Sequence, residues 1–341
     1  MSFNITLDPS GRQFENETGE TLLESALRSG ISIAYHCSGG SCGECHGRLI
    51  KGELGEAEFH DFHFNEQQKS EGAFLLCRNQ AASDLVIQAN EINDPSAILL
   101  QEIETKIYKI EHLNDEYMLL QLRTPRSRTL QFLAGQTVKL TIEGLESYSI
   151  AVASCPCNGL FLQFHINKNH PHPFIQRLSE QEKDVGKIIV EGPFGERTLN
   201  IQYDQPLIFI AKDSEFGAIK SLIEQVINLE LPQAIRLFWI ASNDEQHYMD
   251  NYCRSWSEQL DDYRFKGVKQ GSDETIEAVL AKISAELDFE KQDFLNADSY
   301  IAAPFTDLYL MQEWWQNHHG DSHNIYLMTE NRDHYASKPK N

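Results

Sequence analysis

Four cysteines constrain this chain more than any other feature of its sequence. Cys37, Cys42 and Cys45 follow the spacing C-x4-C-x2-C, and Cys77 stands alone further along the chain. Three closely spaced thiolates with a remote fourth are the ligand pattern of a [2Fe–2S] cluster, which needs four sulfur ligands arriving from different directions. A zinc site usually has two short C-x2-C pairs, and only one is present here. We therefore predict a [2Fe–2S] cluster at these cysteines and a role in electron transfer.

The residues between these cysteines support the same prediction. Gly39, Gly40 and Gly43 leave the backbone free to curl around a cluster and to point amide N–H groups at its sulfurs.

Three further cysteines remain once the cluster ligands are assigned. Cys155 and Cys157 flank a proline, and Cys253 lies far from both. A Cys-Pro-Cys sequence can be interpreted as a redox pair or as two reduced thiols in a loop. We favour reduced thiols because a cytosolic environment keeps cysteines reduced.

Charge and hydropathy limit the partners of the chain. Its 341 residues include 51 acidic and 29 basic side chains, a formal net charge of −22. Phosphates would be repelled, so we expect neither nucleic acid nor an anionic membrane as a partner. A redox partner protein with a basic docking patch fits this charge better. The sequence has no apolar run of 18 residues and no signal-peptide pattern at its start, so we expect a cytoplasmic protein without membrane insertion.

Residues 1–93 have the pattern of a small α+β domain. Residues 3–7 and 13–15 alternate like paired strands, residues 21–28 have apolar side chains at helical spacing, and residues 84–88 form a last strand. With the cysteine loop, this segment resembles the plant-type ferredoxins, which implies a β-grasp fold. The segment has 14 acidic and 6 basic residues, which would surround the cluster with negative charge.

Residues 97–200 read as an antiparallel β-barrel and residues 205–330 as an α/β domain. Period-2 runs at 105–111, 117–122, 137–142, 148–154 and 160–166 predict barrel strands, and a turn is expected at 192–195. Apolar strands at 206–211, 235–241 and 299–303 alternate with helical patterns at 218–229 and 308–315, which predicts a Rossmann-like parallel sheet. Residues 331–341 read as a tail. The predicted fold class is therefore multidomain, α+β followed by α/β.

The barrel and the α/β domain together resemble the ferredoxin–NADP reductase superfamily. The domain order resembles the glucoseen reductases and the reductase components of oxygenases. This resemblance implies that NAD(P)H reduces FAD, and that single electrons pass through the cluster to an oxygenase or a dehydratase. It also implies cofactor-binding positions at Tyr148, Ser149, Ile150, His165 and Ile166.

Four positions depart from the pattern of that superfamily. Glu146 stands where an arginine holds the flavin phosphate, and residues 172–175, His-Pro-Phe-Ile, replace Gly-x-x-Ser. Residues 212–215, Lys-Asp-Ser-Glu, replace a Gly-Gly-Thr-Gly loop, and residues 302–305 read Ala-Ala-Pro-Phe in place of Cys-Gly-Pro. An alternative hypothesis follows: a ferredoxin-type electron carrier fused to a reductase-like body that has lost flavin or NAD(P)H binding and serves docking.

Overall fold

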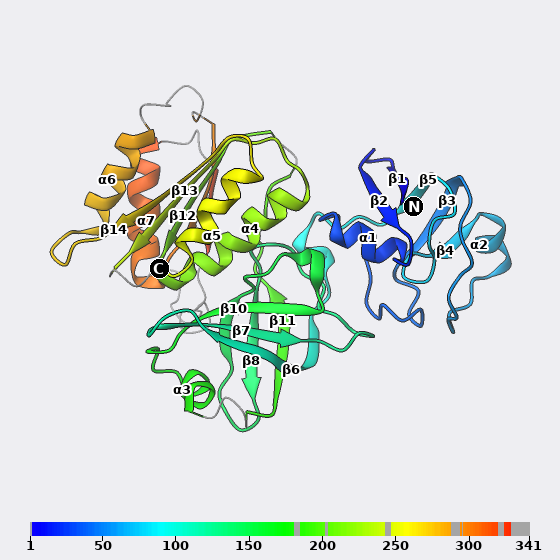
Figure 1. The fold of residues 1–341 in the computed structure, drawn as a ribbon, viewed down its shortest axis with the longest axis horizontal. Coiled ribbons are helices and arrows are strands. Elements are labelled where there is room, and N and C mark those ends of the chain that lie inside the picture. The colour runs from blue at the N-terminus through cyan, green and yellow to red at the C-terminus, as the bar shows by residue number, and fades with distance from the viewer. Residues whose placement is uncertain are drawn as a thin grey trace, which may run out of the picture.

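The computed structural model describes residues 2–180, 185–201, 204–242, 247–287, 294, 296–319 and 324–328. The chain forms three lobes (Figure 1). The N-terminal lobe lies to one side, and residues 90–100 connect it to a β-barrel that sits below the α/β lobe.

The N-terminal lobe is a mixed sheet with one helix packed on it. The sheet order is β2-β1-β5-β3-β4, in which β1 and β5 run parallel and the other pairs antiparallel. Helix α1 begins after Thr21, whose hydroxyl and the Glu24 carboxylate form a capping box, and it buries Leu22, Leu23 and Ala26. The elements are β1 Ser2–Asp8, β2 Gln13–Glu17, α1 Leu22–Arg28, β3 His46–Lys51, α2 Glu66–Ser70, β4 Ala73–Leu75 and β5 Leu85–Ala89.

The middle lobe is a six-stranded antiparallel barrel with the strand order β10-β7-β6-β11-β8-β9. Its core is filled by alternate side chains such as Val138, Leu140 and Ile142 of β8. The elements are η1 Pro95–Ala97, β6 Gln101–His112, β7 Tyr117–Arg123, β8 Thr137–Ile142, β9 Tyr148–Ala151, η2 Pro156–Asn158, β10 Phe161–Asn167, α3 Pro173–Glu180 and β11 Lys187–Phe194.

The C-terminal lobe is a parallel sheet in the order β14-β13-β12-β15-β16. Strand β12 is buried on both faces: Phe209 packs with α4 and α5, and Ile210 packs with α6 and α7. The elements are β12 Leu207–Lys212, η3 Asp213–Glu215, α4 Phe216–Asn228, β13 Ile235–Ala241, α5 Asp250–Ser255, η4 Trp256–Glu258, β14 Tyr263–Lys269, α6 Ile276–Leu287, β15 Asp298–Ala302, α7 Phe305–His319 and β16 Asn324–Met328.

Most predicted elements lie within a few residues of those observed, and the predicted three-part fold class agrees with the structure. Strand β11 differs from the prediction. Residues 192–194, which were expected to form a turn, are the last residues of this strand. Strands β4, β14 and β16 and helices α3, α5 and α6 were not predicted. The predicted tail, residues 331–341, lies outside the described residues, and no described helix is long and apolar enough to cross a membrane.

Hydrogen bonds join the N-terminal lobe to both other lobes. The Gln131 side chain donates to the Ile33 carbonyl at 2.7 Å, and Thr129 Oγ1 donates to the Tyr35 hydroxyl at 3.2 Å. From the C-terminal lobe, Gln225 Nε2 donates to the Gly30 carbonyl at 2.5 Å. Each of these contacts is buried or partly buried, so they fix where the N-terminal lobe sits.

Candidate electron-transfer site

The four predicted cluster ligands are arranged as two pairs. The Cys37 sulfur accepts backbone N–H groups of Gly39, Ser41 and Cys42 at 3.3–3.4 Å, which places Cys42 beside it. Burial alone would raise the pKa of Cys37, but these hydrogen bonds, together with one from the Ser41 side chain, lower it to about 6. The Cys37 thiolate is therefore favoured at neutral pH, as a metal ligand requires.

Cys45 and Cys77 form the second pair. Their hydrogen bond raises the pKa of Cys45, as burial also does, and lowers the pKa of Cys77. No three His, Cys, Asp or Glu side chains surround a single point within the described part of the chain. Two pairs of thiols suit a two-iron cluster, because each iron takes two protein sulfurs. The donor set therefore fits a [2Fe–2S] cluster.

Residues 53–65 cover the cysteine loop. They lie so close to two of its glycines that any larger side chain at either position would clash with them. Gly40 has φ +76°, and a Cβ there would lie 2.6 Å from the His60 side chain; Gly43 has φ +82°, and a Cβ would lie 2.2 Å from the Phe62 ring. The Phe62 N–H also donates to the Gly40 carbonyl at 3.1 Å. These contacts could not be predicted from the sequence, because residues 53–65 have no periodic pattern.

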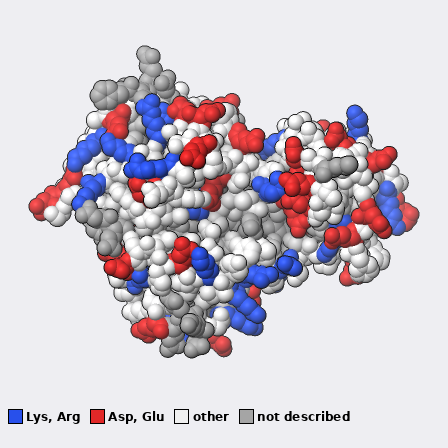
Figure 2. Space-filling view, viewed as in Figure 1, with Lys and Arg blue, Asp and Glu red and all other residues white. Residues whose placement is uncertain are grey.

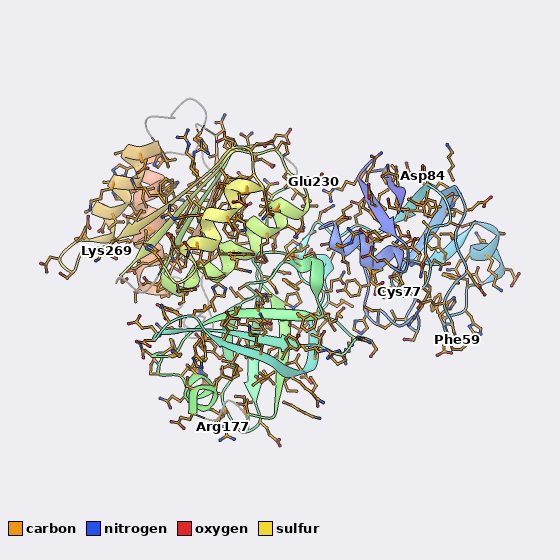
Figure 3. The ribbon with its side chains drawn as sticks, in the orientation of Figure 1. Phe59, Cys77, Asp84, Arg177, Glu230 and Lys269 are labelled. Carbon is orange, nitrogen blue, oxygen red and sulfur yellow. The ribbon has the colours of Figure 1, made fainter. Side chains whose placement is uncertain are left out.

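The outer part of the same segment reaches solvent. Arg78, which follows a predicted ligand, pairs with Glu58 at 2.6 Å, and the neighbouring Phe59 is 86% exposed. Phe59 lies farther from the barrel than Cys77 does (Figure 3). Acidic side chains gather over this lobe (Figure 2).

The inner side of the cysteine loop touches the barrel. The Ser38 and Thr129 hydroxyls are 3.5 Å apart, and the Tyr35 hydroxyl lies 3.4 Å from the Leu130 carbonyl. Tyr35 is fully enclosed, and this burial raises its pKa to about 12 although Thr129 acts in the opposite direction. The cluster loop is therefore in direct contact with barrel residues 129–131, which sequence reasoning did not single out.

Three of the five predicted flavin-site residues lie on β9. The Tyr148 ring is buried and stacks on Phe174 with a centroid separation of 5.9 Å, and His172 lies 5.0 Å from it. Ser149 is half-buried opposite Lys139 of β8. The Ile150 side chain is fully buried in the barrel core, so only its backbone can face a cofactor.

The other two predicted residues are neighbours on β10 and point in opposite directions. Ile166 belongs to the barrel core, whereas His165 faces the C-terminal lobe. His165 Nδ1 lies 3.0 Å from the Tyr248 hydroxyl, and its Nε2 is buried without a hydrogen-bond partner. Burial, and then the charge of Lys220, lower the pKa of His165 well below its usual value. This histidine is therefore neutral in the folded protein.

Comparison with known proteins identifies the family of the chain. A family described as "2Fe-2S iron-sulfur cluster binding domain" matches residues 5–81, which include all four cysteines. The CDP-6-deoxy-L-threo-D-glycero-4-hexulose-3-dehydrase reductase of Yersinia pestis is 30% identical over 276 residues, 81% of this chain and 82% of the relative. The chain belongs to this family of iron–sulfur reductases.

Other relatives agree with that assignment. Reductase component 1 of terephthalate 1,2-dioxygenase from a Comamonas species is 27% identical over 78% of each chain. The solved structure described as "Ferredoxin reductase in carbazole 1,9a-dioxygenase" has a TM-score of 0.57 at 19% identity and covers 97% of this chain and 99% of that one. The prediction of a [2Fe–2S] ferredoxin domain fused to a reductase body is therefore confirmed, as are the three fold types.

Within this iron–sulfur reductase, the backbone N–H groups expected to bind the flavin phosphate already donate hydrogen bonds to other protein groups. Helix α3 starts at Pro173, which has no N–H, and the Phe174 N–H donates to His172 Nδ1 at 3.2 Å. The next two N–H groups donate to the His172 carbonyl. Glu146, two residues before Tyr148, is exposed and carries the wrong charge for a phosphate. A flavin phosphate at the start of α3 would have to replace these hydrogen bonds, so we expect flavin binding there to be weakened.

The expected nicotinamide position is closed in a similar way. Lys212 pairs with Asp307 at 2.6 Å, and the Asp213 carboxylate accepts the Ser242 N–H at 2.9 Å and the Ser242 hydroxyl at 2.8 Å. Asp213 adopts φ +52°, a conformation that glycine adopts more easily. Side chains thus occupy a loop that the reductase resemblance expects to be bare backbone.

Proposed function

We propose that this protein is a reductase component that accepts electrons from NAD(P)H through FAD and passes them singly, through its [2Fe–2S] cluster, to a protein acceptor. The contact between the cluster loop and the barrel at Ser38 and Thr129 is the observation that carries this proposal. It holds the cluster domain against the lobe of the flavin-binding type, and electron transfer requires such proximity. A flavin supplies the conversion of one hydride into two single electrons, which a cluster cannot perform alone.

The residues of the ferredoxin lobe hold and shield the cluster. Backbone N–H groups of Gly39, Ser41 and Cys42 donate to the Cys37 sulfur and stabilise negative charge on it. Phe62 and His60 lie against the loop glycines and limit the access of water. On the barrel side, Tyr148 and His165 are proposed to contact a flavin ring.

The acceptor is proposed to be an oxygenase or a dehydratase with a basic docking patch. The relatives are named as components of a terephthalate dioxygenase, a propane monooxygenase and a hexulose dehydrase system. The excess of acidic residues in the N-terminal lobe favours a basic partner. A cytoplasmic location fits this set of partners.

A second function is favoured by the protein contacts at the cofactor positions. The N–H groups at the start of α3 are used by His172, and Asp213 is bound to Ser242. A chain without tight dinucleotide sites would act as an electron carrier whose body serves docking.

Two measurements on the purified protein separate these functions. Flavin released by denaturation is quantified against cluster iron, and the paramagnetic signal of the reduced cluster is recorded after anaerobic addition of NADH or NADPH. We expect stoichiometric FAD and a cluster signal with at least one nucleotide. Absence of flavin, with a cluster that only dithionite reduces, would support the electron carrier instead.

A further inference from the structure

A pair of thiols lies where the three lobes meet. Cys155 and Cys157 belong to the turn around η2, which packs against α1 of the ferredoxin lobe and α4 of the C-terminal lobe. Cys155 is buried and Cys157 is half-buried. Neither the cluster nor the proposed cofactor sites use them.

The two sulfurs converge on one side chain of α4. Asn228 Nδ2 lies 3.0 Å from the Cys155 sulfur and 3.5 Å from the Cys157 sulfur, and the Cys157 N–H donates to the Cys155 sulfur at 3.2 Å. Two thiols that share a donor and are separated by one residue are close enough for a small movement to join them.

The same turn is hydrogen-bonded to the residues that hold the ferredoxin lobe against the C-terminal lobe. The Cys155 thiol donates to Gln225 Oε1 at 3.4 Å, and Gln225 Nε2 donates to the Gly30 carbonyl. Gly30 follows α1 and lies so close to α4 that a Cβ would be 3.1 Å from Leu229 and 3.2 Å from Asn228. Cys155 is therefore the first group in a hydrogen-bonded chain that ends on the ferredoxin lobe.

We propose that Cys155 and Cys157 are a redox-active dithiol. Its reversible oxidation to a disulfide weakens the contact between the ferredoxin lobe and α4 of the C-terminal lobe. Closure removes the Cys155 S–H donor and draws its sulfur toward Cys157, so Gln225 loses a partner that helps orient it. The proposal does not depend on flavin or NAD(P)H binding.

The two thiols have different parts in the reaction with a small-molecule disulfide such as oxidised glutathione. The neighbouring Cys155 side chain lowers the pKa of Cys157, whereas burial, and then the neighbouring Cys157, raise the pKa of Cys155. Cys157 thiolate attacks a glutathione sulfur, forms a mixed disulfide and releases one glutathione thiolate. Cys155 then loses its proton, attacks the Cys157 sulfur and releases the second thiolate. The protein gives up two electrons and two protons, and two reduced glutathione molecules form.

The pair can be tested directly by mass spectrometry. The full-length protein with its cluster is equilibrated anaerobically in mixtures of reduced and oxidised glutathione, quenched in acid, alkylated under denaturing conditions and digested with trypsin. Cleavage after Lys139 and Lys168 releases a peptide in which Cys155 and Cys157 are the only cysteines. We expect its doubly alkylated form to give way to a form with an internal disulfide as the mixture becomes more oxidising, and dithiothreitol to reverse the change.

Single variants and an internal control test the separate roles of Cys155 and Cys157 in the disulfide exchange. Cys155→Ser should trap glutathione on Cys157, whereas Cys157→Ser should leave the buried Cys155 unmodified. Cys253, in the peptide 237–254, is also buried and should remain fully alkylated in every mixture. A wild-type peptide that stays doubly alkylated even in oxidised glutathione alone overturns the proposal. Equal modification of the two single variants overturns the division of roles.

Hydrogen exchange tests the link to the ferredoxin lobe. Oxidised wild type should exchange amides of residues 26–34 roughly three- to tenfold faster than reduced wild type, the effect of one lost hydrogen bond. Cys157→Ser should show no such change, and Gln225→Ala should exchange faster even when reduced. Disulfide formation with unchanged exchange in this segment overturns the coupling.

Discussion

The cluster loop and the dinucleotide positions of this molecule differ in how far each keeps the features its chemistry requires. Around the cluster, four cysteines, the loop glycines and the N–H groups aimed at Cys37 are all present. At the start of α3 and after β12, protein groups already make hydrogen bonds at the positions where the reductase resemblance expects a dinucleotide. A cluster is held by four covalent bonds, whereas a dinucleotide is held by many weak contacts. One site tolerates no loss, and the other weakens gradually as contacts are lost.

The largest expected effect is on the cluster itself. Cys42→Ser should abolish or shift the paramagnetic signal of the reduced protein, because an alkoxide is a poorer ligand for these irons than a thiolate. The same result is expected for serine at Cys37, Cys45 or Cys77. Cys253→Ser is the matched control and should leave the signal intact. An unchanged signal in all four ligand variants would refute the cluster assignment.

A second prediction concerns acid stability of the body, where His165 lies. Its pKa is depressed in the folded protein, so below about pH 6.5 the unfolded chain binds a proton that the folded chain does not. Its stabilising contribution is complete above that pH and falls as the pH drops, by up to about 1.4 kcal/mol per pH unit. All four tryptophans are in the C-terminal lobe, so their fluorescence during urea unfolding reports this part of the molecule.

His165→Gln should remove that pH dependence. His63→Asn, a change at an exposed histidine of the ferredoxin lobe, is the control and should preserve it. An identical pH slope in wild type and His165→Gln would show that other groups cause it.

The third prediction tests whether the flavin position is only weakened. Glu146→Arg should tighten FAD binding about tenfold, ~1.4 kcal/mol, because a cation replaces an exposed carboxylate near the phosphate. Fluorescence titration of FAD and FMN measures the effect, with Glu143→Arg as a control for net charge. If neither wild type nor Glu146→Arg binds a flavin below roughly 100 µM, the reductase function fails.

A smaller effect is expected at the nicotinamide position. Wild type should bind NADH and NADPH with dissociation constants in the high micromolar range or above, at least ~100 µM, about −5.5 kcal/mol. Asp213→Gly should tighten binding about fivefold, since it relieves the positive φ and removes a carboxylate. Ser242→Ala breaks the same hydrogen bonds without freeing the backbone and should give no gain. Tight calorimetric binding by wild type would contradict this view of the loop.

The smallest expected effect is at the junction of the lobes. Tyr35→Phe removes the hydroxyl that Thr129 contacts and should cost about 0.5 kcal/mol, the low end for a single hydrogen bond. The loss is measured as a lower temperature for bleaching of the cluster absorbance. Tyr108→Phe, at an exposed tyrosine of the barrel, should change nothing. Equal melting temperatures for the two variants would show that the Tyr35–Thr129 hydrogen bond does not help to hold the lobes together.

The sequence predicted features that depend on neighbouring residues and missed those that depend on distant ones. Cysteine spacing and the helical spacing of apolar residues in 21–28 are local, so both were visible before the structure. Strand β14 was missed because its alternating Arg264 and Lys266 look like a loop until β13 pairs with it at the sheet edge. The contact of Tyr35 with Thr129 spans 94 residues and exists only after two lobes have docked.

The two sides of the cysteine loop have a consequence for throughput. Ser38 and Tyr35 face the barrel, whereas Phe59 and Glu58 lie on the segment that reaches solvent, so the donor and the acceptor need not compete for one surface. If electrons arrive on one face of the cluster domain and leave from another, the cluster can reduce the acceptor while its domain stays docked on the barrel. Turnover would then follow the encounter rate with the acceptor and its ionic-strength dependence. Because no hinge has to swing between cycles, added viscosity should slow turnover only as far as it slows that encounter.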